Sequence, residues 1–146
     1  MNILVYFIVL LGSVILISAD IPVEDCGSRH GSFSNVTLSC PGTEECILKR
    51  NTNVSLNIQF TPAENSKKVT AVVHGVIQGI SVFFPIPNPD ACSSVKCPLK
   101  KGENYSYSAS FFVKKSYPKV KVGVKWELQD DNQEDIICVL IPAHIQ

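Results

Sequence analysis

The feature that most constrains the fold of this chain is a strict alternation of apolar and polar residues over segments of strand length. The pattern is unbroken over residues 119–128 and recurs over residues 54–60, with Pro62 ending the second segment. Because successive side chains of a strand point to opposite faces, each segment predicts a strand with one buried and one solvated face. No window of helical length carries a 3.6-residue pattern.

Five less regular segments also have strand character: residues 33–38, 68–77, 80–84, 105–113 and 135–145. Turn signals such as Pro41-Gly42 and Asn88-Pro89-Asp90 separate them. About seven short strands at this spacing predict an all-β sandwich or barrel. Residues 82–89 are apolar but contain three prolines, so they must run as an edge strand or a rigid loop. With Phe111-Phe112-Val113 they form either a fixed apolar mouth or a cap on the core.

The chain begins with an apolar stretch that ends at Ser18-Ala19, which is typical of a cleaved secretory signal peptide over residues 1–19. Residues 20–146 then form one domain. The segment Met1-Asn2 has no Lys or Arg, so an uncleaved anchor is the alternative. Three Asn-x-Ser/Thr sequons support secretion and predict surface glycosylation at Asn35, Asn53 and Asn104.

Six cysteines follow the leader: Cys26, Cys40, Cys46, Cys92, Cys97 and Cys138. In a small secreted chain they predict disulfides, although six cysteines allow fifteen connectivities. Cys40 and Cys46 flank a Pro-Gly turn, and Cys92 and Cys97 flank a short polar loop. If those neighbours pair, the two remaining cysteines join the first strand to the last. A zinc site is the rival interpretation, but the spacing is unusual and no Cys-x-x-Cys is present.

The charge balance is neutral, with 13 basic and 13 acidic residues, so it gives no indication of a nucleic-acid partner. Eight lysines nevertheless cluster in the sequence between residues 91 and 125, against one acid, Glu103. They form either an ordinary solvated face or a docking face for an anionic membrane surface.

Catalytic motifs are absent: the chain has no Gly-x-Ser-x-Gly, no His-Glu-x-x-His and no phosphate-binding glycine loop. His30, His74 and His144 are scattered, and His74 is more easily understood as a structural or pH-responsive residue than as a base. We therefore predict no enzymatic activity, no cofactor and no metal.

Several short motifs together carry a family resemblance. They are Asp25-Cys26-Gly27-Ser28, residues 71–75, residues 84–92, Tyr105-Ser106-Tyr107, Tyr117-Pro118 and residues 126–131. Over nearly the whole chain after the leader, including all six cysteines, the sequence resembles the Niemann-Pick type C2 family of lipid-recognition (ML) domains. Residues 46–50 and 97–102 are also similar to the group 2 mite allergens.

The resemblance implies an immunoglobulin-like sandwich of two antiparallel sheets that part to hold one sterol, tail first. It implies the disulfides Cys26–Cys138, Cys40–Cys46 and Cys92–Cys97. The ligand-binding positions that it implies are Phe84, Val113, Tyr117, Pro118, Val122, Val124 and Trp126. Ile80 and Val82 match an apolar rim that faces a membrane or a partner transporter.

Two departures from the family pattern bear on function. Val139 stands where vertebrate sterol carriers have tryptophan, which implies a lumen that is wider or shaped for another lipid. Asn57 stands at the position of the lysosomal sorting sequon but begins no sequon. The expected function is a monomeric, secreted sterol carrier that delivers its cargo to membranes or a transporter, outside the cell or in the lysosomal lumen. The alternative is an extracellular carrier of fatty acids or semiochemical lipids in chemosensory or innate-immune recognition.

Overall fold

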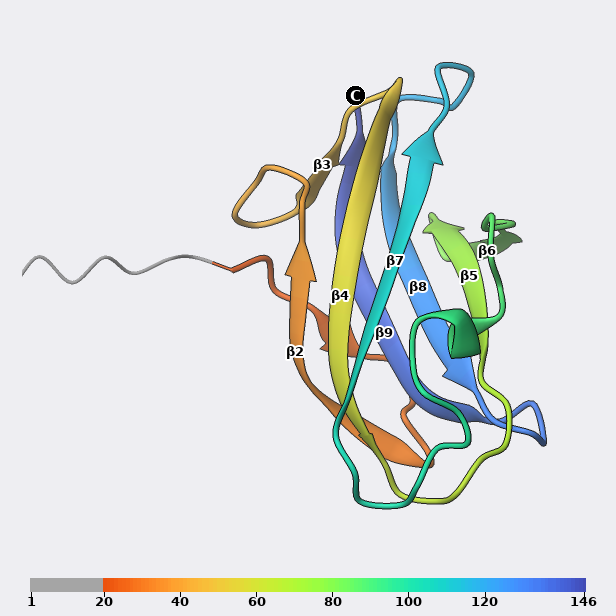
Figure 1. Ribbon diagram of the computed structural model, residues 1–146. Coiled ribbons are helices and arrows are strands. Elements are labelled where there is room, and N and C mark those ends of the chain that lie inside the picture. The colour runs from red at the N-terminus through yellow and green to blue at the C-terminus, as the bar shows by residue number, and fades with distance from the viewer. Residues whose placement is uncertain (1–19) are drawn as a thin grey trace, which may run out of the picture.

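A computed structural model describes residues 20–146, and the predicted leader, residues 1–19, lies outside the described residues. Figure 1 shows two β-sheets packed face to face. The smaller sheet has the order β2-β4-β7, with β2 Gly31–Leu38, β4 Thr52–Pro62 and β7 Tyr105–Val113. These strands correspond to the predicted segments at residues 33–38, 54–60 and 105–113.

The larger sheet has the order β1-β9-β8-β5-β6, and β3 pairs with β9 outside that path. Its long strands are β5 Thr70–Ile77, β8 Lys121–Gln129 and β9 Asp135–Ile145. Its short strands are β1 Glu24–Asp25, β3 Cys46–Leu48 and β6 Ile80–Phe83. The predicted all-β sandwich is thus confirmed, with two short strands, β1 and β3, beyond the seven expected.

One pairing differs from the expected antiparallel arrangement. β3 runs parallel to β9, with Cys46 opposite Ala143 and Leu48 opposite Ile145. A parallel pair needs a long connection, and the chain supplies one because β4 to β8 lie between these two strands in the sequence. This pairing brings Leu48 to the end of the sandwich where the C-terminus lies (Figure 1).

The core lies between the two sheets, and its largest completely buried side chains include Trp126, Tyr107, Phe60 and Ile58. Along β8, Val122, Val124 and Trp126 are buried while Lys121 is exposed, as the alternation predicted. The proline-rich segment also behaves as expected. It contributes only the short edge strand β6 and then runs irregularly to the 3₁₀ helix η1 at Ala91–Ser93.

Three disulfides form with the pairing that the family resemblance implied, Cys26–Cys138, Cys40–Cys46 and Cys92–Cys97. The zinc interpretation is therefore wrong, because all six sulfurs are in S–S bonds. Cys40–Cys46 joins the end of β2 to the start of β3, and so links the smaller sheet to the larger one. None of the helices in residues 20–146 is long and apolar enough to cross a membrane.

Candidate functional site

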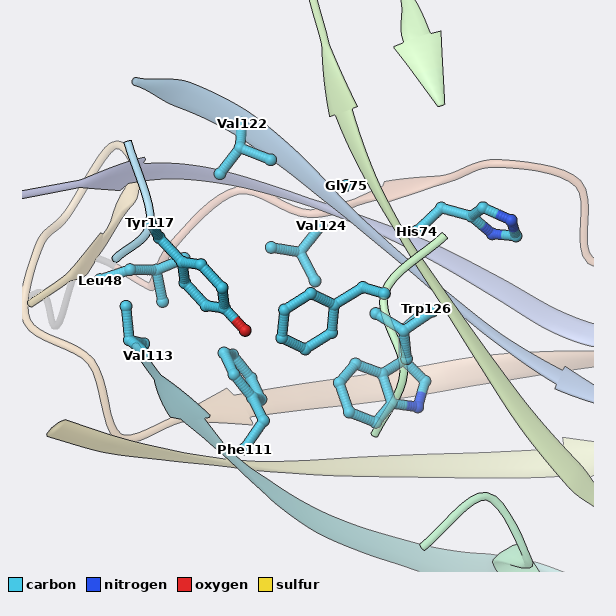
Figure 2. Close-up of a pocket in the computed structure, with 11 residues that line it drawn as sticks. Leu48, His74, Gly75, Phe111, Val113, Tyr117, Val122, Val124 and Trp126 are labelled. Carbon is cyan, nitrogen blue, oxygen red and sulfur yellow. The ribbon is translucent and has the colours of Figure 1, made fainter. Parts of the chain in front are cut away.

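A small apolar cavity lies between the sheets, bounded by β5 and β8 on one side and by β7 on the other. Its volume is about 60 Å³. Figure 2 shows the side chains around it. The wall consists of Leu48, Val73, His74, Gly75, Phe84, Phe111, Val113, Tyr117, Val122, Val124 and Trp126.

Six of the seven predicted ligand-binding positions lie in this wall: Phe84, Val113, Tyr117, Val122, Val124 and Trp126. The seventh, Pro118, is exposed in the loop between β7 and β8 and does not border the cavity. Val139 is completely buried opposite Trp126 in the β8–β9 register and is also absent from the wall. Val139 therefore does not border this cavity, and the expected effect of valine at this position on the shape of the lumen stays a prediction.

Other wall residues were not predicted as ligand-binding positions. Val73 and Gly75 lie opposite Trp126 and Val124 in the β5–β8 register, so they share the inward face with them. Phe111 has the same parity as Val113 on β7. Strand parity could have identified these three as inward-facing. It could not have identified Leu48, because β3 is too short to show any alternation.

His74 borders the cavity, but its imidazole points away from it (Figure 2). The ring faces the outer side of the larger sheet, where its Nδ1 atom lies 3.7 Å from Oε1 of Glu127. The predicted structural interpretation of His74 fits this placement better than a role as a base in the cavity.

A row of aromatic rings runs inward from the surface along the cavity. Tyr117 packs edge-on against Phe84 with ring centroids 5.7 Å apart, and Phe84 packs edge-on against Phe111 at 6.2 Å. Phe111 then contacts Trp126 at 6.0 Å, and Trp126 contacts Tyr107 at 6.2 Å. Phe84 and Tyr117 are only half-buried, whereas the inner rings are buried. The half-buried pair therefore marks the mouth of the cavity.

Local hydrogen bonds position the two mouth residues. The Phe84 backbone N–H donates to the Val73 carbonyl at 2.9 Å, which extends the β5–β6 ladder by one bond. The Arg50 guanidinium donates to the backbone carbonyl of Lys115 at 3.1 Å and lies 3.5 Å from that of Tyr117. Partial burial raises the pKa of the Tyr117 phenol above its usual value, so this side chain stays neutral at the mouth.

The cavity is much smaller than an ordinary ligand site. Pockets for drug-sized molecules measure roughly 300–1,000 Å³, against about 60 Å³ here. Among residues 20–146 the Cys40–Cys46 bond is the one disulfide between the sheets, and it lies at the β2–β3 side. Phe84 directly follows the edge strand β6, and Tyr117 lies in the loop that runs from β7 of the smaller sheet to β8 of the larger one. No disulfide of the described residues ties the sheets together at the rings of Phe84 and Tyr117.

The predicted rim residues lie on the edge strand β6. Ile80 and Val82 are 67% and 53% exposed, and Phe83 is 63% exposed. Val82 is opposite Gly75 of the cavity wall in the β5–β6 register. Because facing residues share one side of a sheet, Ile80 and Val82 project on the cavity side, beyond the edge of the smaller sheet. They form an exposed apolar lip next to the mouth.

The eight lysines do not form the single face that their sequence clustering suggested. Lys100 and Lys101 precede β7, whereas Lys114 and Lys115 follow it. A strand of nine residues spans roughly 30 Å, so the two pairs lie at opposite ends of the sandwich. Lys125 is on the outer face of the larger sheet, 3.7 Å from Glu127. The lysines near the mouth are those of the Tyr117 loop: Lys114, Lys115 and Lys119.

A buried polar cluster occupies the outer face of the larger sheet. Glu127 is only 8% exposed and lies between the ammonium of Lys125 and the imidazole of His74. Burial and the neighbouring Glu127 carboxyl raise the pKa of Asp135 to about 7. Asp135 is therefore partly protonated near neutral pH.

Two sets of side chains bring three possible metal ligands together, with ligand atoms within 4.8 Å of one another. One is Glu127, Asp135 and Cys138, but Cys138 is in a disulfide. The other is His30, Asp130 and Glu134. His30 already pairs with Glu134, which raises the pKa of the imidazole, and Asp130 accepts two backbone N–H groups of its own turn. Both sets are thus engaged in internal contacts.

Comparison with known proteins agrees with this geometry. The ML domain family profile matches residues 20–145. The chain is 50% identical over 145 residues to the NPC intracellular cholesterol transporter 2 homolog a of Drosophila melanogaster, covering 97% of this chain and 98% of that protein. It is 44% identical over 124 residues to NPC intracellular cholesterol transporter 2 of Mus musculus, covering 84% and 83%.

Among solved structures, the Niemann-Pick type C2 protein from the Japanese carpenter ant superimposes with a TM-score of 0.82 at 36% identity, covering 86% of this chain and 100% of the ant protein. Neither the family description nor these names refer to an enzymatic reaction. The sequence similarity extends over nearly all of the described chain. The superposition on the ant protein extends the similarity to the two-sheet fold. The chain therefore belongs to the ML domain family, among the Niemann-Pick type C2 proteins.

Proposed function

We propose that this protein is a secreted lipid carrier that holds a single sterol between its two sheets and delivers it to membranes or to a partner transporter. The observation that supports the proposal is the apolar cavity between the sheets, closed at one side by the half-buried rings of Phe84 and Tyr117. The fly and mouse relatives are named as cholesterol transporters, which favours a sterol over other lipids.

The energy for binding comes from burial of apolar surface. Covering roughly 500 Å² of ligand at about 25 cal/mol per Å² gives on the order of 12 kcal/mol before association costs, enough for micromolar to nanomolar affinity. Part of this energy is used to separate the sheets, because a sterol cannot fit into about 60 Å³. The wall contains no Lys, Arg, Asp or Glu, and its one histidine, His74, turns its ring outward, so selection rests on shape and volume.

The surroundings of the mouth suit contact with a bilayer. Ile80 and Val82 offer an exposed apolar lip, and Lys114, Lys115 and Lys119 stand on the adjoining loop. Basic residues near an anionic surface each contribute about 1 kcal/mol of attraction. In this orientation the mouth faces the acyl region, and a sterol passes between membrane and cavity without crossing water.

Native mass spectrometry of the secreted protein, combined with lipid extraction, tests the ligand. We expect one co-purified sterol per chain, and a fluorescent sterol that competes with it. Displacement by fatty acids alone would instead support the alternative carrier of fatty acids or semiochemical lipids. Absence of any bound lipid, together with no binding of added sterol or fatty acid, would refute the carrier function.

Vesicle transfer assays test the mouth orientation with a matched pair of triple variants. Lys114, Lys115 and Lys119 replaced by glutamine should slow sterol transfer to anionic vesicles at low salt. The same change at Lys96, Lys100 and Lys101, which precede β7, should have little effect. Equal transfer rates to neutral and anionic vesicles for the unmodified protein would show that the basic loop has no such role.

A further inference from the structure

The smaller sheet differs from the rest of the molecule in having no charge. None of the residues in β2, β4 or β7 is Lys, Arg, His, Asp or Glu. Solvated sheet faces and sheet edges normally carry charged side chains, which keep the protein soluble and prevent strand pairing between molecules. The larger sheet follows that rule on its outer face, with Lys121, Lys125 and Glu127 on β8 alone.

The outward positions of the smaller sheet carry hydroxyl and carboxamide side chains instead. In the strand registers these positions face one another across all three strands. Phe112 is the one apolar side chain among these outward positions. The polar ones are Ser32, Asn35, Thr37, Asn53, Ser55, Asn57, Gln59, Thr61, Ser106, Ser108 and Ser110. We call this surface the neutral face.

The three sequons, which are far apart in the sequence, converge on the neutral face. Asn35 lies on β2 opposite Gln59, and Asn53 lies on β4 opposite Phe112. Asn104 immediately precedes β7 and has the same parity as Ser106. All three asparagines are exposed. They are spread over the face, one at each end and one on the β2 edge.

The side-chain amides of these asparagines are available for modification. Asn104 accepts a hydrogen bond from Thr61 through Oδ1 at 2.6 Å, which leaves its Nδ2 atom free. Within residues 20–146, Nδ2 of Asn35 and of Asn53 also makes no hydrogen bond. Asn57, which begins no sequon, contrasts with them: its Nδ2 donates to the hydroxyls of Ser106 and Ser108, both at 2.8 Å.

The neutral face needs a cover because its edges are only partly protected against association. On β7 the Ser108 backbone N–H donates to the Ser94 hydroxyl at 2.8 Å, but no further strand pairs with this edge. β2 and β7 are the edge strands of the sheet. β7 has the sequence YSYSASFFV, with high β-propensity, no charge and no proline, which is the composition that favours strand pairing between chains. Phe112 is 42% exposed on this face. The one register irregularity of β2, between Phe33 and Asn35, protects only part of its edge.

We propose that N-linked glycans on Asn35, Asn53 and Asn104 cover the neutral face and take the place of surface charge there. In the secretory pathway a lipid-linked oligosaccharide pyrophosphate is the donor. The Asn Nδ2 atom forms a bond to C1 of the first sugar, the bond from C1 to the pyrophosphate oxygen breaks, and Nδ2 loses one proton. The glycan on Asn53 shields Phe112, and the glycan on Asn35 blocks the β2 edge.

The covered face leaves the lipid mouth free. Asn35, Asn53 and Asn104 project outward from the smaller sheet, whereas Phe84 and Tyr117 close the cavity between the sheets. The glycans therefore restrict contacts with membranes and partners to the remaining surface. This inference is independent of the proposed sterol ligand and depends only on passage of the chain through the secretory pathway.

Glycopeptide mapping and intact mass of the protein secreted from insect cells test the modification. We expect glycans at all three asparagines and three stepwise losses of mass on enzymatic release. Ser55→Ala should remove only the glycan on Asn53, Ser55→Thr should retain it, and Asn57→Gln should leave the glycan mass unchanged. An unmodified Asn35, Asn53 or Asn104 in the secreted protein would overturn the proposal.

Light scattering after size-exclusion chromatography tests the covering role. Trimming the folded, secreted protein with an endoglycosidase that leaves only the first sugar adds no charge and should cause association that increases with concentration. The triple variant Asn35→Gln, Asn53→Gln, Asn104→Gln should behave in the same way. The triple variant Asn35→Lys, Asn53→Lys, Asn104→Lys restores charge to the face and should stay monodisperse. Sterol binding should be unchanged by trimming. Trimmed protein that remains as monodisperse as the glycosylated form would refute the covering role.

Discussion

Filling the cavity should stabilise the fold and weaken lipid binding at the same time. A void of about 60 Å³, at about 24 cal/mol per Å³, costs the fold roughly 1.4 kcal/mol. Val124→Ile keeps a β-branched side chain in β8 and places one more methylene group, worth about 0.8 kcal/mol, in this space. We therefore expect the free energy of unfolding to rise by up to about 1 kcal/mol, or roughly 3–5 °C in Tm.

Binding should change in the opposite direction. The added group occupies space that the lipid needs, and overpacking of this kind costs about 1–3 kcal/mol, which corresponds to a roughly 5- to 150-fold loss of affinity. Denaturant unfolding of the delipidated protein and titration with a fluorescent sterol measure the two effects. Val54→Ile is the matched control, because Val54 is also a buried valine, on β4, but does not border the cavity.

The control separates the possible outcomes. Val54→Ile should destabilise the fold, since no space receives the extra methylene. If Val124→Ile is destabilising to the same extent, the region beside Trp126 is already filled, and the reasoning about the void is wrong. If Val124→Ile stabilises the fold but leaves sterol affinity unchanged, the lipid does not enter between β5, β7 and β8.

Three further predictions concern stability. The pKa of Asp135 is raised from its usual value of 3.8 to about 7 by burial and by Glu127. Protonation of Asp135 therefore contributes stability to the fold that is fully present below pH 3.8 and is lost as the pH rises through about 7. Denaturant titrations from pH 4 to 8 should show this loss, and Asp135→Asn should flatten the profile; an unchanged profile would contradict the assignment. The Tyr107 hydroxyl is buried with no hydrogen-bond partner among the described residues, so Tyr107→Phe should raise the unfolding free energy by about 1 kcal/mol. A loss of stability in chemical unfolding would show that the hydroxyl is bonded. Replacing Cys26 and Cys138, 112 residues apart, by alanine should cost about 5 kcal/mol, whereas replacing Cys92 and Cys97, 5 residues apart, should cost about 2 kcal/mol; equal losses in Tm would contradict the loop-entropy argument.

Alternation and parity predicted most of the fold. The segments at residues 105–113 and 135–145 match β7 and β9 residue for residue. The short strands β1 and β3 were missed because two or three residues carry no period. The parallel β3–β9 pair depends on contacts between distant parts of the chain, which no local pattern encodes.

Strand parity also made part of the site predictable. Parity alone indicates that Val122, Val124 and Trp126 point inward, but it does not say which stretch of the inner face borders a void. That depends on how the two sheets pack, and it explains why Leu48 was missed and why Val139 lies outside the wall. The eight lysines do not share one face, because β7 carries the chain from one end of the sandwich to the other.

The distribution of charge links the two proposals. The smaller sheet carries none, and the outer face of the larger sheet carries Lys121, Lys125 and Glu127 on β8. Burying either surface against a membrane would cost free energy, because one would have to displace its glycans and the other would have to desolvate ionised groups. The β6 lip and the Tyr117 loop combine exposed apolar side chains with lysines that pair with no acid among the described residues. If both proposals hold, the protein can approach an anionic bilayer favourably only with the cavity mouth first. The neutral face and the outer face of the larger sheet then fix the orientation needed for lipid transfer as much as the mouth does.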